Sequence, residues 1–389
     1  MIGSDSMKYY AELLKIIEGG LRGDKQKISD YSILLAKKLK TAGEERKSER
    51  IEKILARTGN DPNEVFSSSF KQVPFDHETK LEIASIIMPN EVQEKKLIYN
   101  LTVNQQVDEF IASYQELDQL ASYGLSMPST LLLYGPPGCG KTELALHISR
   151  KLNLPIVLAR LDTLISSYLG STSKNIRMLF EYASKTPCIL FLDEFDAVAK
   201  LRDDPNELGE LKRVVNSLLQ NIDLLNDKSV LIAATNHENL LDKAIWRRFS
   251  TRIHINYPNT ESRYGIISHI LEEIGYNHIN QNFIGILVNM FENLSVADIE
   301  QIVKRSIRTA VIQHREVEFL DFIDCYFSYV PTNVDLTGDL DSVRREKIKF
   351  LLKTDPNISQ RLLGQIFKCH HNTIRSELRK IHKEIELNE

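Results

Sequence analysis

One stretch of eight residues limits what this chain can fold into more than any other feature. It is the run Gly135-Pro136-Pro137-Gly138-Cys139-Gly140-Lys141-Thr142, with the spacing G-x-x-x-x-G-K-T. The apolar run Leu131 to Tyr134 precedes it and a helical pattern follows, so it predicts a glycine-rich loop between a buried strand and a helix. Such a loop points backbone N–H groups at phosphate oxygens. We expect Lys141 to reach the β- and γ-phosphates of a nucleotide and Thr142 to complete the coordination of Mg²⁺.

A second apolar run supplies two adjacent carboxylates. Cys188 to Leu192 has the composition of a buried strand, and Asp193 and Glu194 follow it directly. Ligands of open α/β sheets bind at the carboxyl ends of the strands. We therefore expect Asp193 to hold Mg²⁺ through water and Glu194 to polarise the attacking water. The sequence thus predicts an ATP hydrolase that uses ATP and Mg²⁺, with Asp193, Glu143 and all eight loop residues in the nucleotide site.

Further candidate strands alternate with helical segments on either side of these motifs. They are Pro155 to Leu161, Val230 to Ala234 and Arg252 to Tyr257. This alternation predicts an α/β fold with a doubly wound parallel sheet, the core of a P-loop nucleoside triphosphatase. After Pro258 three amphipathic segments predict a small helical lid. They are Glu261 to Ile274, Phe283 to Phe291 and Val296 to His314.

Five segments are expected along the chain. They are an N-terminal helical module (1–57), a linker and helical connection (58–106), the large α/β ATPase part (107–258), the helical lid (259–335) and a basic helix-turn-helix-like module (336–389). The N-terminal module rests on apolar residues at helical spacing between Tyr9 and Leu55. The turn-rich stretch from Thr58 to Phe75 marks the first boundary.

The amino-acid composition limits the cellular environment and the binding partners that we expect. A net charge of -4 over 389 residues gives no global attraction to nucleic acid or to anionic membranes. The four cysteines show no CxxC pair, which suits reduced thiols. No apolar run approaches the roughly 20 residues that span a bilayer. We expect a cytoplasmic protein with no membrane partner.

The motif series GPPGCGKT, CILFLDEFD, LIAATN and LDKAIWRRF resembles that of AAA ATPases, over roughly Val107 to Gln313. The resemblance implies that Asn236 orients the lytic water. It further implies that Arg247 and Arg248 are arginine fingers that reach the γ-phosphate of a neighbouring subunit, which requires a ring, usually of six identical chains. By the same resemblance Tyr168, Leu169 and Gly170 form a loop that lines a central pore and grips extended polypeptide.

The C-terminal end carries a local excess of positive charge. Asp341 to Glu389 holds eleven Lys/Arg and seven Asp/Glu, a net +4 in a chain that is negative overall. Ser359 to Phe367 and His371 to Ile385 are predicted helices joined by a short turn, which resembles a helix-turn-helix. In that geometry Asn372, Thr373, Arg375 and Arg379 are candidate DNA contacts. A tri-helical unit that docks a protein partner fits the same pattern, and both interpretations stay open.

Two functions follow from these observations. The first is a ring-forming ATPase that remodels or unfolds a protein substrate through its pore. A separate protease subunit, and a setting in mobile elements or antiviral defence, are left open as its context. The alternative is a DNA-binding ATPase or regulator that uses the C-terminal helices and whose assembly is controlled by nucleotide.

Overall fold

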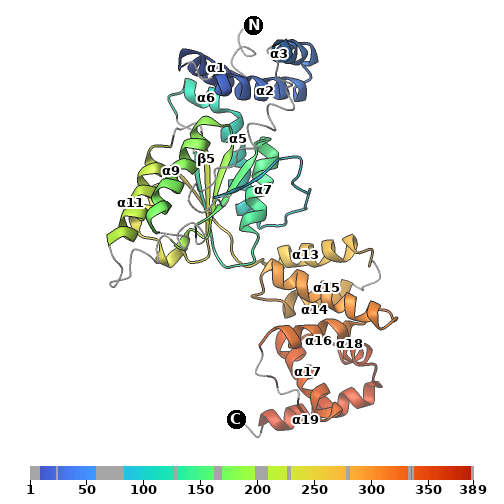
Figure 1. Ribbon diagram of the computed structural model, residues 1–389. Coiled ribbons are helices and arrows are strands. Elements are labelled where there is room, and N and C mark those ends of the chain that lie inside the picture. Colours follow the sequence, from blue (N-terminus) through green and yellow to red (C-terminus); the bar gives the residue numbers. More distant parts are fainter. Residues whose placement is uncertain are drawn as a thin grey trace. The chain divides into compact units, whose positions relative to one another are not determined.

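The computed structural model describes residues 9–22, 25–57, 83–125, 129–161, 169–197, 209–225, 229–276, 281–331, 334 and 337–386 (Figure 1). The chain forms two compact units. The first comprises Met1–Leu97, Leu101–Pro136 and Lys141–Ile255. The second comprises Ile98–Asn100, Pro137–Gly140 and Asn256–Glu389.

The first unit is built on a six-stranded sheet with the order β1-β3-β4-β5-β2-β6. Its strands are β1 (Ser85–Ile87), β2 (Thr130–Tyr134), β3 (Ile156–Arg160), β4 (Ile189–Asp193), β5 (Val230–Thr235) and β6 (Thr251–His254). All neighbouring pairs are parallel except β1 with β3. The predicted α/β fold is confirmed, but the sheet is not parallel throughout. The antiparallel edge strand β1 was missed because three residues are too short for a recognisable pattern.

Helices cover both faces of this sheet. They are α5 (Leu101–Gln115), α6 (Leu117–Ser122), α7 (Lys141–Leu152), α9 (Leu169–Lys185), α11 (Gly209–Asp223), the 3-10 helix η1 (Glu238–Leu240) and α12 (Lys243–Trp246). Figure 1 shows α9 and α11 on one side of the sheet and α7 on the other. Strand residues such as Leu132, Leu190 and Leu231 are fully buried, because a parallel sheet between two helical layers has no face in water.

Three N-terminal helices complete the first unit. They are α1 (Tyr10–Arg22), α2 (Lys25–Thr41) and α3 (Glu45–Arg57), in agreement with the helical pattern of the sequence. Ile33 of α2 belongs to the same hydrophobic core as the sheet. Lys38 Nζ donates to Glu12 Oε1 at 2.7 Å and lies 5.5 Å from the ring centre of Tyr114. These contacts hold the N-terminal helices against α5.

The second unit is helical. Its helices are α13 (Thr260–Glu273), α14 (Gln281–Met290), α15 (Val296–Ile312), α16 (Phe319–Tyr329), α17 (Leu340–Thr354), α18 (Gln360–Ile366) and α19 (His371–Glu386). The three lid helices predicted after Pro258 are present, but α16 was not predicted. Its sequence does have helical spacing, since Asp321, Asp324 and Ser328 lie on one face and the buried residues on the other, so this helix could have been predicted.

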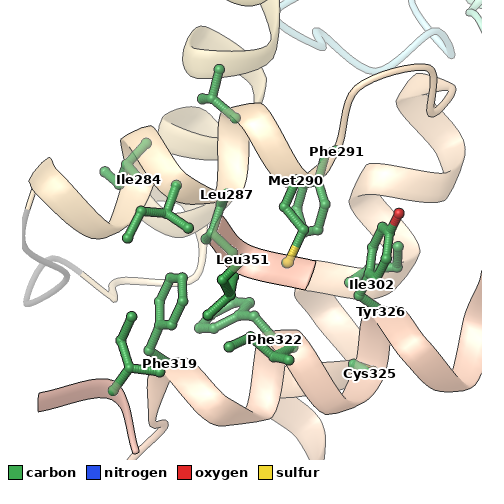
Figure 2. Packing of buried hydrophobic residues seen from close by; sticks show 14 of the residues in the cluster. Ile284, Leu287, Met290, Phe291, Ile302, Phe319, Phe322, Cys325, Tyr326 and Leu351 are labelled. Carbon is green, nitrogen blue, oxygen red and sulfur yellow. The ribbon is translucent and has the colours of Figure 1, made fainter. Parts of the chain in front are cut away.

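A single hydrophobic core runs through this unit. Figure 2 shows Leu287 and Met290 of α14, Ile302 of α15, Phe322 of α16 and Leu351 of α17 within one cluster. The predicted lid and the predicted C-terminal module therefore share buried apolar surface. Burial at roughly 25 cal/mol per Å² makes such a cluster the main stabilising term of the unit. The segment boundaries themselves stay predictions.

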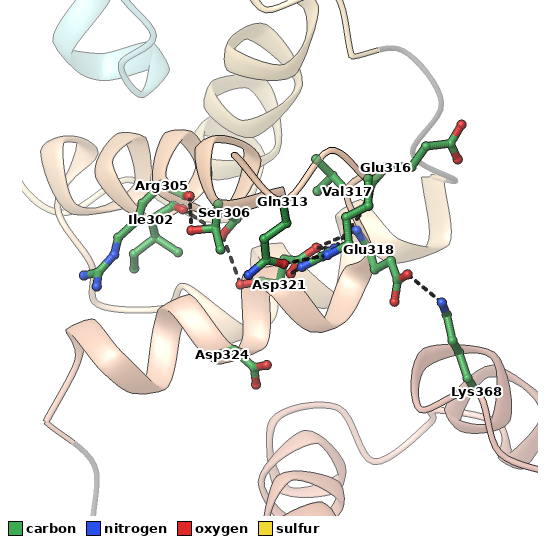
Figure 3. A network of polar contacts seen from close by, with 12 residues as sticks. Ile302, Arg305, Ser306, Gln313, Glu316, Val317, Glu318, Asp321, Asp324 and Lys368 are labelled. Carbon is green, nitrogen blue, oxygen red and sulfur yellow. Dashed lines mark hydrogen bonds and ion pairs between the residues drawn. The ribbon is translucent and has the colours of Figure 1, made fainter. Parts of the chain in front are cut away.

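A polar network lies at the start of α16 (Figure 3). Arg315 Nη1 donates to Asp321 Oδ2 at 2.7 Å, and the backbone N–H of Glu318 donates to the same oxygen at 2.8 Å. Burial acts to raise the pKa of Asp321, but these bonds outweigh it and the pKa is lowered. Lys368 Nζ donates to Glu318 Oε1 at 2.5 Å, which joins the turn between α18 and α19 to α16.

The four cysteines are free thiols, and burial raises the pKa of Cys188 to about 12. A thiol with so high a pKa stays protonated and unreactive at neutral pH. Among the described residues, no helix is both long enough and apolar enough to cross a bilayer.

Gly135 provides a direct test of the backbone path into the glycine-rich loop. Its φ is +133°, and a Cβ there would lie 2.1 Å from the carbonyl oxygen of Ile255. We expect Gly135→Ala to lower the free energy of unfolding by about 1–3 kcal/mol from backbone strain alone. The steric clash with the Ile255 carbonyl oxygen adds to this loss. Gly124→Ala is the matched control, since its φ is +71° and open space surrounds it. Denaturant unfolding followed by circular dichroism would measure both, and equal losses would contradict the clash.

Candidate nucleotide-binding site

The glycine-rich loop connects the end of β2 to the start of α7, as predicted. Lys141 is the first residue of α7 and its side chain is buried. Lys141 Nζ donates to the carbonyl oxygens of Gly135 and Pro136, at 2.7 and 2.8 Å. An ammonium folded over the loop, next to the first N–H groups of a helix, forms an anion site.

The metal-binding candidates meet at the carboxyl edge of the sheet. Thr142 Oγ1 in the first turn of α7 donates to Asp193 Oδ2, the last residue of β4, at 3.3 Å. The backbone N–H of Glu194 donates to Asp193 Oδ1 at 2.9 Å, which fixes the carboxylate. Hydroxyl and carboxylate oxygens are the hard ligands that Mg²⁺ prefers. The structure thus brings together the pair that the sequence assigned to the metal.

Glu194 has a backbone conformation that L-residues rarely adopt. Its φ is +55°. Strained backbone of this kind costs on the order of 1–3 kcal/mol and clusters at functional sites. The strain turns the chain directly after β4, so Glu194 does not continue the alternation of the strand.

Arg160 is a site residue that the sequence reasoning missed. It ends β3 and is the register partner of Asp193, and its Nη2 lies 3.0 Å from Glu194 Oε1. Both side chains are partly exposed, 54% and 38%, so this ion pair is worth no more than about 1 kcal/mol. Glu194 can therefore exchange the guanidinium for another partner at low cost. The signal was present, since Arg160 lies near the end of the predicted strand Pro155 to Leu161, at the same sheet edge.

Asn236 directly follows β5 and is half-buried, at the position predicted for it. The residue before it is held firmly, because the buried hydroxyl of Thr235 donates to Asp196 Oδ1 at 3.3 Å. Thr235 Oγ1 also accepts from the backbone N–H of His237 at 3.1 Å. These bonds fix the turn that carries Asn236 beside the acid pair's strand.

The two candidate arginine fingers differ in their surroundings. Arg248 donates through Nη2 to Asp223 Oδ2 at 2.8 Å and through Nη1 to the carbonyl oxygen of Ala244 at 2.7 Å. Arg247 is exposed, and its side chain makes no hydrogen bond or ion pair with any residue that the structure describes. Arg248 is thus held within its own chain, while Arg247 is available to an outside ligand.

The remaining residues predicted for the nucleotide site and the pore loop are Glu143, Tyr168, Leu169 and Gly170. Glu143 Oε1 accepts from Lys95 Nζ at 2.7 Å on the exposed side of α7. Leu169 and Gly170 begin α9. Tyr168 lies outside the described residues.

The loop fits the phosphates of a nucleotide by its shape. Gly140 has a φ of +92°, and a Cβ there would lie 2.8 Å from the hydroxyl of Tyr99, which donates to the Gly140 carbonyl oxygen. In the same unit the backbone N–H of Ala297 donates to the carbonyl oxygen of Gly138 at 3.1 Å. A side chain is therefore excluded at Gly140, and the backbone at Gly138 and Gly140 is held by contacts within this unit. The donor set suits ATP, and the Thr142 and Asp193 oxygens suit Mg²⁺.

A parallel sheet with a glycine-rich loop after one strand and an acid pair after another defines a P-loop nucleoside triphosphatase. Residues 131–257 match the model of the ATPase family associated with various cellular activities (AAA). This part of the chain is an AAA ATPase domain.

The chain is also similar to individual known proteins. An uncharacterized AAA family ATPase of Sinorhizobium fredii is 42% identical over 214 residues, 54% of this chain and 63% of that protein. A putative 26S proteasome regulatory subunit homolog of Methanocaldococcus jannaschii is 32% identical over 263 residues, 67% of this chain and 63% of that protein. The chain thus spans less than two thirds of the length of either relative. The crystal structure of the FIGL-1 AAA domain has a TM-score of 0.56 at 21% identity, covering 71% of this chain and 95% of that one, and shows the fold alone.

Proposed function

We propose that this protein hydrolyses ATP and uses the energy to remodel protein substrates as a homo-oligomeric ring. The observation that carries the ATPase assignment is the meeting of Thr142, Asp193 and Glu194 at one sheet edge. Its first test is ATP turnover by the purified full chain. Absence of Mg²⁺-dependent turnover in every assembly state would contradict it.

The chemistry divides among the residues of the site. Lys141 leaves the loop carbonyl groups to neutralise the β- and γ-phosphates. Thr142 and Asp193 would hold Mg²⁺, which supplies electrostatic stabilisation of the transferred phosphoryl group. Glu194 releases Arg160, accepts a hydrogen bond from the attacking water and takes its proton, while Asn236 orients that water. Asp193, Glu194 and Asn236 end or follow a strand at the same sheet edge, and Lys141 and Thr142 lie in the first turn of α7.

Ring assembly is supported by the arginines near the end of α12. Arg247 has no partner within the described part of its own chain, so a neighbouring subunit's nucleotide is a suitable ligand for it. Arg248 positions this segment through its bonds to Asp223 and Ala244. A ring of six such chains would complete each ATP site with a finger from the adjacent subunit. The resemblance of the M. jannaschii relative to a proteasome regulatory subunit supports a protein substrate and leaves a separate protease as a candidate partner.

The pore prediction concerns Tyr168, next to the start of α9. In Tyr168→Ala we expect unfolding of a model substrate to slow by roughly an order of magnitude. Losing about 1.4 kcal/mol of contact energy between the aromatic ring and the substrate corresponds to a tenfold change. ATP turnover should stay within about twofold, because the acid pair and the loop are untouched. Tyr168→Phe is the matched control and should keep most of the unfolding rate. If Tyr168→Ala unfolds the substrate at an unchanged rate, Tyr168 does not contact the substrate during unfolding.

The alternative function, a DNA-bound ATPase or regulator, has one observation in its favour. An open groove on α19 is lined by polar and basic side chains. DNA binding and protein remodelling are compatible in one chain, because the groove residues and the ATP-site residues are different.

A further inference from the structure

The C-terminal helices have no task in ATP hydrolysis, yet they form a well-built local structure. Ser359 Oγ accepts from the backbone N–H of Leu362 at 3.2 Å and caps the start of α18. Phe367 to His370 then form a tight turn in which Lys368 has a φ of +50°, and α19 begins at His371. The buried apolar residues of α17, α18 and α19 belong to the hydrophobic core of the second unit. They are Ile348, Leu351, Leu363, Ile366, Ile374 and Ile381.

This helix pair is also held from outside. Lys368 in the turn pairs with Glu318 at the start of α16, as Figure 3 shows. Lys347 of α17 pairs with Asp324 of α16. The shared hydrophobic core, more than these partly exposed ion pairs, connects the helices to α16 and presents α19 as a fixed surface element.

The exposed face of α19 is polar and basic. An open groove of about 400 Å³ is lined by Asn372, Arg375, Ser376, Arg379 and Lys380. Arg375 and Arg379 are four residues apart on one helix face, so they are about 6 Å apart along the axis. Two guanidinium groups, an amide and a hydroxyl on one helix face offer hydrogen-bond donors of the kind that read base edges and phosphates.

The one acidic residue among the first ten of α19 is turned away from this face. The side chain of Glu377 is only 5% exposed, and it accepts from Arg345 Nε of α17 and from Lys380 Nζ, both at 2.8 Å. Its negative charge is therefore compensated inside the unit. The groove therefore presents Arg375 and Arg379 to an anionic ligand, while Glu377, which the sequence places between them, faces inward.

We propose that α18 and α19 form a DNA-binding helix-turn-helix and that α19 enters the major groove of duplex DNA. The major groove is about 12 Å wide and admits one helix. Asn372 near the helix start lies where recognition helices contact bases, Arg375 and Arg379 contact guanine edges or phosphates, and Lys380 lies beside the backbone. The site is additional to the proposed ATP-driven function and does not depend on it.

The test uses the full chain and a fluorescently labelled duplex of mixed sequence, titrated between about 50 and 200 mM salt. For Arg375→Ala with Arg379→Ala we expect the affinity to fall at least about tenfold, and the slope of log affinity against log salt to fall by about two. The matched control is Arg305→Ala with Arg308→Ala. It removes the same charge from a second groove of about 450 Å³ on α15.

The outcomes separate the proposal from its rivals. Loss of duplex binding in the α19 variant alone, with unchanged thermal unfolding, supports it. No salt-dependent binding by the parent chain, the same loss in the α15 control, or equal affinity for single-stranded DNA would each overturn it. ATP turnover of the α19 variant should match the parent, so failure of DNA binding leaves the proposed ATPase unaffected, and the reverse also holds.

Discussion

Arg247→Ala is expected to lower ATP turnover per subunit by about 10³- to 10⁵-fold, the range that an arginine finger contributes to phosphoryl transfer. The guanidinium offsets charge that develops on the γ-phosphate, and a truncated side chain leaves that charge facing water. Nucleotide binding and folding should be retained, because Arg247 is exposed and makes no side-chain bond with any described residue. Steady-state ATP hydrolysis and fluorescent-nucleotide binding measure the two quantities.

The Arg248→Ala variant serves as the comparison for Arg247→Ala. Removing its bonds to Asp223 and to the Ala244 carbonyl oxygen should lower the free energy of unfolding by about 1.5–3 kcal/mol, the value of hydrogen bonds to charged groups. Arg247→Ala should leave that free energy unchanged. Normal turnover in Arg247→Ala would remove the finger from the mechanism.

Glu194→Gln is expected to bind ATP with nearly normal affinity and to hydrolyse it about 10²- to 10⁴-fold more slowly, the range of general-base catalysis. The amide keeps the size of the side chain but cannot take a proton from water. Single-turnover hydrolysis, measured with binding, separates the chemical step from affinity. Near-normal turnover would show that another group activates the water.

Arg160→Gln is the matched control for that variant. It removes the cation that pairs with Glu194 but leaves the carboxylate, and a partly exposed pair is worth no more than about 1 kcal/mol. We expect its turnover to change by less than about tenfold.

Mixing Arg247→Ala chains with Glu194→Gln chains tests whether the ATP site is shared between subunits. A ring that contains both places an intact Arg247 from the Glu194→Gln chain beside an intact Glu194 from the Arg247→Ala chain. Turnover of the mixture should therefore exceed that of either variant alone. A mixture that stays as inactive as its components, although mixed assemblies form, would contradict a finger acting between subunits.

Sequence alone was sufficient for the ATPase core, because its signals are local. The loop from Gly135 to Thr142 has a fixed spacing, and Asp193 and Glu194 follow a continuous apolar run. In a parallel sheet such strand ends must meet at one edge, so their proximity could be derived without coordinates. The helices of the lid and of the C-terminal end were likewise predictable from apolar spacing, and α16, which was not predicted, has the same kind of spacing.

Only the tertiary structure decided the features that depend on which distant side chains meet. The pairing of Arg160 with Glu194 needs the β3–β4 register, and the different surroundings of Arg247 and Arg248 need α11 to bring Asp223 near. The sequence of α19 places Glu377 between Arg375 and Arg379, and only packing against Arg345 shows that this acid faces inward. Spacing along the chain fixes the face of a helix or strand, whereas the partner of that face is set by long-range packing.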